Sequence, residues 1–107
     1  MQIFNLKSME VFPYEQRDKN VLYQDDNFKT RIIELKEGEK LPPHGPCEMV
    51  SYVVFYLISG KIGVTINGEY NEPEQGHCII SEPDNYQMEA KLPTRILGIQ
   101  IQPSEKK

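Results

Sequence analysis

The sequence predicts a single small domain built almost entirely of antiparallel β-strands, folded as a barrel with a pocket. The chain has 107 residues, which is about one domain and allows one hydrophobic core. Turn-forming residues recur about every eight to twelve positions, a spacing that is typical of β-sandwiches and barrels. No window of helical length is free of proline, glycine or a run of β-branched residues. Together these observations favour an all-β fold.

The start of the chain precedes the first clear strand and is predicted to be an N-terminal extension. We expect residues 1–20 to pair along a sheet edge as a strand, or to reach a partner as a dimer arm. Within them, residues 14–20 can form at most a short turn of helix. Residues 1–7 lack a basic region followed by a long apolar stretch, so we expect no secretory signal and a cytoplasmic location. The barrel is predicted to span residues 21–103, and residues 104–107 are predicted to be a disordered tail.

Strand candidates lie between the turn signals. Residues 28–35 alternate in part, and one of their faces consists of Lys29, Arg31, Ile33 and Leu35. Residues 50–58 are apolar on both faces, which predicts a central strand packed on two sides. The remaining candidates are residues 61–67, 77–81, 86–91 and 95–102, the last with Ile96, Gly98 and Gln100 on one face.

Two turn signals predict how the middle strands are joined. Asn67-Gly68 predicts a type I′ hairpin, because both residue types tolerate the positive φ that this turn requires. Ser59-Gly60 is expected to turn the apolar strand before it into the same meander.

Composition narrows the classes of partner. The net charge is −4 and the basic residues are scattered, so we expect no nucleic-acid binding. The longest strongly apolar run, residues 53–58, is far shorter than the roughly twenty residues of a membrane span, so we expect no membrane insertion. Cys47 and Cys78 are predicted to be reduced, half-buried thiols, with a disulfide between them as the alternative.

Two short patterns carry a resemblance to a known family. The matching positions are Gly38, His44 and Gly60 of a first motif, and Gly76 and Pro83 of a second, with Asn85 in place of a glycine. On these positions residues 38–101 resemble the cupin superfamily. The resemblance implies an antiparallel jelly-roll β-barrel in a single domain, and it also implies a homodimer.

The resemblance implies a metal site that this sequence does not retain. In cupins, two histidines and a glutamate of the first motif and a histidine of the second bind a divalent metal. Here the glutamate position falls on Val53, counted back from Gly60, and the second-motif histidine falls on Met88. Valine and methionine cannot replace a carboxylate or an imidazole as ligands of such an ion. A divalent metal is therefore not the expected cofactor, and no other cofactor is indicated.

The first hypothesis for function is a cupin-like protein that binds a small molecule or a protein partner through an intact scaffold. The candidate ligand pocket consists of His44, Tyr52, Val53, Phe55, Tyr86 and Met88. The alternative for these side chains is that they simply fill the barrel, whose interior is barely wide enough for them.

The second hypothesis is a metal-dependent cupin enzyme, of the dioxygenase or isomerase type, with a rearranged site. Its candidate ligands are His44, Cys47 and Glu48, since His-x-x-Cys spacing occurs in zinc sites and a glutamate can add an oxygen. The sequence assigns no catalytic residue. A third hypothesis is a regulatory module whose DNA-binding part lies elsewhere, because the chain has no helix-turn-helix of its own.

Overall fold

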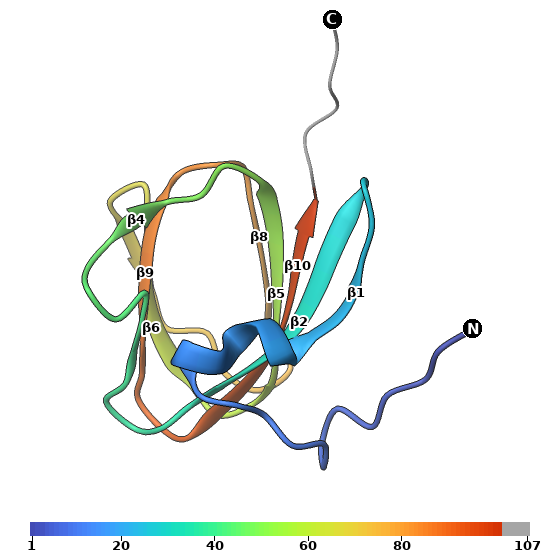
Figure 1. Cartoon of the computed structure of the whole chain (residues 1–107). Helices are drawn as coiled ribbons and strands as arrows, with labels where there is room; N and C mark the ends of the chain where they lie inside the picture. The colour runs from blue at the N-terminus through green and yellow to red at the C-terminus, as the bar shows by residue number, and fades with distance from the viewer. Residues whose placement is uncertain (102–107) are drawn as a thin grey trace, which may run out of the picture.

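The structure, a computed structural model, describes residues 1–101 and consists of two antiparallel sheets that face each other (Figure 1). One five-stranded sheet has the order β1-β2-β10-β5-β8. The other has the order β3-β9-β6-β7, and β4 also pairs with β9. The chain crosses repeatedly from one sheet to the other, which confirms the predicted antiparallel jelly-roll fold. The strands are β1 (Val21–Gln24), β2 (Phe28–Leu35), β3 (Lys40–Leu41), β4 (Cys47–Glu48), β5 (Tyr52–Ser59), β6 (Ile62–Ile66), β7 (Glu69–Asn71), β8 (Cys78–Ser81), β9 (Asn85–Ala90) and β10 (Thr94–Ile101).

The connection between β6 and β7 is the predicted hairpin. Asn67 has φ 52° and Gly68 has φ 77°, so both central residues adopt the left-handed conformation of a type I′ turn. The turn places Ile66 opposite Glu69 in the β6–β7 ladder. This local signal was strong enough to predict the register of the pair.

The expectation for Ser59-Gly60 is wrong. β5 pairs with β10 and β8, whereas β6 lies in the opposite sheet, so the turn carries the chain from one sheet to the other. Gly60 has φ 92°, and a Cβ there would collide with Thr94 and with the carbonyl oxygen of Pro93. Only glycine allows the two sheets to approach so closely at this crossing.

β5 is central in its sheet, as predicted, but it is covered on one face only. Its alternate residues Tyr52 and Tyr56 are 48% and 41% exposed. The apolar character of both faces therefore does not mean that both faces are buried within this chain. One face belongs to the core and the other is an apolar outer surface.

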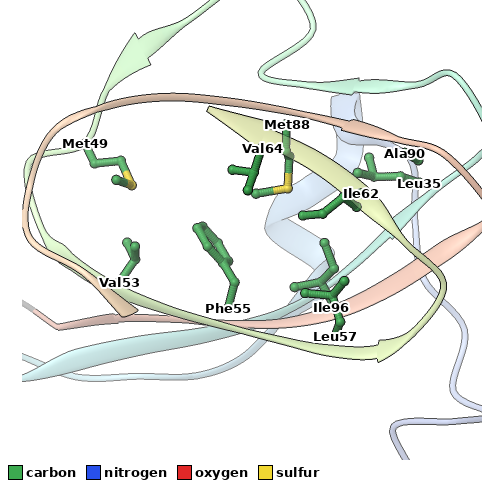
Figure 2. Packing of buried hydrophobic residues seen from close by; sticks show 10 residues of the cluster. All are labelled: Leu35, Met49, Val53, Phe55, Leu57, Ile62, Val64, Met88, Ala90 and Ile96. Atoms are coloured by element: carbon green, nitrogen blue, oxygen red, sulfur yellow. The ribbon is translucent and has the colours of Figure 1, made fainter. Parts of the chain in front are cut away.

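The core lies between the two sheets. Figure 2 shows Phe55 and Leu57 on one sheet pointing toward Val64 and Met88 on the other. Burial of this face stabilises the fold at about 25 cal/mol for each Å² of apolar surface removed from water. The buried cluster consists of Leu35, Met49, Val53, Phe55, Leu57, Ile62, Val64, Met88, Ala90 and Ile96.

The N-terminal extension does not form the edge strand that was one of its two predicted forms. Residues 14–20 form a short 3-10 helix, η1 (Tyr14–Asn20), which packs against β2 (Figure 1). The side chain of Asn20 holds the preceding loop, because its amide donates to the Phe12 carbonyl oxygen and its oxygen accepts from the Phe12 N–H, both at 2.8 Å. A hydrogen-bonded helical segment cannot also supply a ladder of strand hydrogen bonds. The dimer arm stays a prediction.

Arg95 on β10 fastens the first residues of the chain to the five-stranded sheet. Its guanidinium donates to the carbonyl oxygens of Leu6 at 2.9 Å and Met9 at 2.8 Å, and it pairs with the Glu34 carboxylate at 3.0 Å. Within residues 1–101 no helix is long and apolar enough to cross a bilayer. The predicted tail, residues 104–107, lies outside the described residues.

Candidate ligand-binding cavity

A cavity of about 320 Å³ opens between the two sheets. Its lining comes from both sheets, from the loop around β4 and from η1. Pockets that hold small molecules in proteins span roughly 300–1,000 Å³, so this cavity suits a small ligand.

The inner wall of the cavity is apolar. Met49, Val53 and Phe55 line it and lie together at one end of the core cluster (Figure 2). The Tyr86 ring, from the opposite sheet, stands 6.1 Å from the Phe55 ring, measured between centroids. The two rings, from facing sheets, are close enough to pack against each other, and together they give the cavity an aromatic wall that suits an apolar or aromatic group.

Arg31 brings a positive charge into this apolar wall. In the sheet ladder Arg31 lies opposite Gly98, and Gly98 lies opposite Phe55, so the three share the inward face. Arg31 lines the cavity, and its Nε is a buried nitrogen without a hydrogen-bond partner among the described residues. An unmade hydrogen bond of this kind costs about 1–3 kcal/mol, and more when the group is charged.

Gly98 makes the space beside Arg31. A Cβ built at this position would meet the Ile33 and Phe55 side chains at 3.4 and 3.5 Å, which is ordinary van der Waals contact. The glycine is therefore not required by the backbone, and its lack of a side chain leaves room on the cavity floor. Because a Cβ already contacts Ile33 and Phe55, the further atoms of a larger residue would occupy space beside these two side chains.

The hydroxyl of Tyr86 remains protonated over the physiological range. The pKa of Tyr86 is raised to about 12, chiefly by burial and to a smaller extent by the neighbouring Cys47 and Tyr14, against the opposing effect of the positive charge of Arg31. A neutral phenol can donate one hydrogen bond into the cavity. Gln100, which shares the inward face of β10, also lines the cavity and adds an amide.

Three of the charged residues that line the cavity are engaged with other parts of the chain. Glu34 pairs with Arg95 at 3.0 Å, and Glu39 accepts a hydrogen bond from the Lys36 N–H at 2.9 Å. Arg17 on η1 lies over the Tyr14 ring at 4.1 Å and donates to the Tyr14 carbonyl oxygen at 2.9 Å. Among residues 1–101 no carboxylate forms an ion pair with Arg31.

A second, larger hollow of about 680 Å³ lies where edge strands β7 and β8 leave the two sheets unjoined. Its lining is richer in charged and amide side chains, including Glu69, Glu72 and Asp84. The one buried side-chain nitrogen or oxygen without a partner in the described part of the chain is Arg31 Nε, which does not line this hollow. The cavity beside Arg31 is therefore the stronger candidate site.

The structure divides the six predicted pocket residues. Val53, Phe55 and Tyr86 line the cavity together. Met88, 1% exposed, belongs to the adjoining core and does not reach the lining. Tyr52 is not a pocket residue, because it lies on the outward face of β5, where it is half exposed. His44 is not one either, since it is exposed in the loop before β4.

The rearranged metal site is not assembled. Within residues 1–101, no three His, Cys, Asp or Glu side chains are grouped so that they could hold a metal ion. Cys47 and Glu48 are neighbours on β4, so their side chains point to opposite faces, and His44 lies apart in the loop. With Val53 and Met88 buried in the apolar core, the residues present do not fit the metal of the family pattern.

Both cysteines are free and exposed, rather than half-buried as expected. The alternative of a disulfide between Cys47 and Cys78 is not formed.

Arg31, Gly98 and Gln100 are among the cavity residues that sequence reasoning missed. A signal for Arg31 was present. Alternate residues of a strand share a face, and Arg31 alternates with Ile33 and Leu35, which pack at the core. Gly98 and Gln100 likewise lie on the same face of their strand as the buried Ile96. A charged residue in a core-facing row is the signal that marks this site.

Comparison with known proteins rests on structure, since the sequence matches no protein-family model and no curated protein. A Klebsiella pneumoniae protein with a double-stranded β-helix domain is similar with a TM-score of 0.77 at 14% identity, over 94% of this chain and 90% of that one. A cupin superfamily protein from Desulfitobacterium hafniense is similar with a TM-score of 0.70 at 13% identity, over 78% and 74%. A cupin protein from Bacteroides fragilis is similar with a TM-score of 0.64 at 22% identity, over 78% and 72%.

This chain has the cupin fold. The predicted resemblance is thereby confirmed at the level of architecture. A cupin fold hosts many functions, so the function has to be argued from the cavity. In this cupin-like chain the cavity is lined by Arg31, whose Nε is buried, and the described residues contain no metal-binding cluster.

Proposed function

We propose that this chain is a cupin-like small-ligand-binding protein, which holds its ligand in the cavity between the sheets. The observation that carries the proposal is the cavity of about 320 Å³ with an apolar inner wall and polar groups converging from Arg31, Tyr86 and Gln100. Largely apolar pockets with a few placed polar groups are the usual form of small-molecule sites.

The donor set argues against the metal-dependent enzyme alternative. A catalytic metal in a protein is held by about three side-chain ligands from His, Cys, Asp or Glu. The proposed set His44, Cys47 and Glu48 does not converge, and the positions of the family pattern carry Val53 and Met88. Ligand binding in the cavity would instead use Arg31, Tyr86 and Gln100, which line it together.

The proposal is tested by metal content and by filling the cavity. We expect elemental mass spectrometry of untagged protein to find far less than one divalent metal per chain. In two-dimensional NMR titrations with a panel of small aromatic and aliphatic compounds, shift changes should map to the cavity lining. Gly98→Val should abolish these changes, because the added methyl groups occupy the floor beside Phe55. Ile99→Val, on the outward face of the same strand, is the matched control.

Two results would count against the proposal. One is about one tightly bound divalent metal per chain, lost in His44→Ala, which would restore the enzyme hypothesis. The other is binding of the panel that Gly98→Val leaves unchanged, which would place the ligand outside the cavity.

We also propose that two copies of the chain associate through the outward face of the five-stranded sheet. The sheet ladder sets Tyr52 beside Ile101, and Val54 beside Ile99, on this face. Exposed aromatic and aliphatic residues in a contiguous patch are typical of protein–protein contacts. A flat apolar patch that is shared by identical chains can pair with itself around a two-fold axis.

A further inference from the structure

We propose that the ligand is a small monocarboxylate with an apolar or aromatic body, and that Arg31 binds its carboxylate. The inference rests on the proposed function, since it requires the cavity to be the binding site. It adds the chemical class of the ligand and the residue that recognises it.

The guanidinium of Arg31 is free to bind a carboxylate. It makes no ion pair and no hydrogen bond with another described residue, and its Nε is buried beside the cavity. An arginine presents Nε–H and one Nη–H as parallel donors that match the two oxygens of a carboxylate. A carboxylate in the cavity would satisfy the buried Nε–H and neutralise the charge together.

The other cavity groups favour one negative charge rather than two. Of the other two cations that line the cavity, Arg17 already donates to the Tyr14 carbonyl oxygen, and Lys40 lies on β3 in the opposite sheet. Arg31 is thus the one arginine that remains available at the cavity. A phosphate dianion normally requires several cations or backbone N–H groups around it, whereas a carboxylate is satisfied by one arginine and one or two neutral donors.

Neutral donors are available on the same wall. Tyr86 keeps its hydroxyl proton, and Gln100 lies on the inward face of β10, two residues from Gly98. Either group can donate to a carboxylate oxygen that Arg31 leaves accessible. The carboxylate is therefore expected at the side of the cavity where β2 and β10 face β9.

The remaining lining indicates the body of the ligand. The inner part of the wall beside Arg31 includes Met49, Val53 and the rings of Phe55 and Tyr86, whereas the carboxylates of the lining lie on β2, on η1 and around β3 and β4. Such a wall gains by burying apolar surface and has few partners for further hydroxyl or amide groups. An aromatic or short aliphatic acid satisfies both halves of the cavity.

The test compares acids with their uncharged amides. NMR titrations of the full chain are carried out with benzoate and benzamide, and with hexanoate and hexanamide. We expect each acid to bind at least about tenfold more tightly than its amide, since a hydrogen bond to a charged group contributes more than a neutral one. Arg31→Met should remove this preference. Lys29→Met, a cation on the same strand and face that does not line the cavity, is the matched control and should keep it.

A stability measurement separates recognition from a structural role. Arg31 has no partner in the described structure, so Arg31→Met should leave the melting temperature unchanged or raise it. A marked fall in melting temperature together with an unchanged acid preference would show that Arg31 is structural, and would overturn the inference. Arg31→Lys keeps the charge but loses the two-pronged geometry, so it should fold and bind the acids more weakly.

The outcomes for wild-type protein distinguish the two proposals. If the amides bind in the cavity as tightly as the acids, the carboxylate inference is wrong and the ligand-binding function stands. If neither the acids nor the amides bind at millimolar concentration, and the Gly98→Val variant gives the same titration spectra as wild type, the ligand-binding function and the carboxylate inference are both wrong. Preference for the acids that is lost with Arg31→Met supports both.

Discussion

The two faces of strand β5 are alike in their apolar side chains but differ in exposure. Residues of the inward face are buried, with Phe55 5% and Leu57 0% exposed. Their neighbours on the outward face, Tyr52 and Tyr56, are 48% and 41% exposed. Both faces are apolar, but only one packs against a second sheet within this chain.

The difference assigns separate tasks to alternate residues. The inward face of the five-stranded sheet supplies the core and the cavity wall, where Arg31 is the charged exception. The outward face contributes little burial to the single chain, and its fully buried exception is Ile32, on the strand that η1 contacts. Substitutions on the two faces should therefore affect different properties, stability on one and association on the other.

The largest expected effect comes from adjacent residues on β5. Leu57→Ala removes a fully buried side chain and should lower the free energy of unfolding by about 2–5 kcal/mol. Tyr56→Ala should cost less than about 1 kcal/mol, because its ring is already half in water. Urea unfolding at low protein concentration measures both. Equal losses for the two variants would contradict the assignment of the faces.

The second largest expected effect is a fall in the stability of the protein at alkaline pH. The pKa of Tyr86 is raised from 10.0 in a free tyrosine to about 12, so between these values the unfolded chain loses the proton while the folded chain keeps it. The stability that this proton contributes to the folded state is fully present below pH 10. It is lost as the pH rises toward about 12, and the loss in the free energy of unfolding amounts to about 3 kcal/mol. The free energy of unfolding of wild type should fall over this range relative to that of Tyr86→Phe, which has no hydroxyl to titrate. The same comparison with Tyr52→Phe, on the outward face, is the control.

Much of the fold could be predicted from local patterns. Residues 28–35 were predicted as a strand and form β2 with the same bounds, because alternation and flanking turn residues both act within a few positions. Asn67-Gly68 likewise specified its own turn. The sheet change at Gly60 could not be predicted, since it depends on the close approach of Thr94, a contact between distant parts of the sequence.

The site could be predicted only in part. Val53 and Phe55 followed from the strand pattern, but Tyr52 was grouped with them although alternation sets it on the opposite face. His44 could not be placed, because the loop before β4 has no periodic pattern to orient it. Arg31 was overlooked because a charged side chain is usually in solvent, and only the ladder with Gly98 and Phe55 reveals its inward position.

The smallest effect on the stability of the single chain is expected for substitutions on the outward face of β5. There the main consequence should be the loss of the dimer. Wild-type protein is expected to have the mass of a dimer by light scattering, and Tyr52→Lys the mass of a monomer. Because Tyr52 is half exposed, the substitution should change the stability of the separated chain by no more than about 0.5 kcal/mol. Thr65→Lys, an exposed position on β6 in the other sheet, should leave the dimer intact. A monomeric wild type at every concentration would mean that this apolar face does not join two copies, and the difference between the two faces of β5 would then need another partner to explain it.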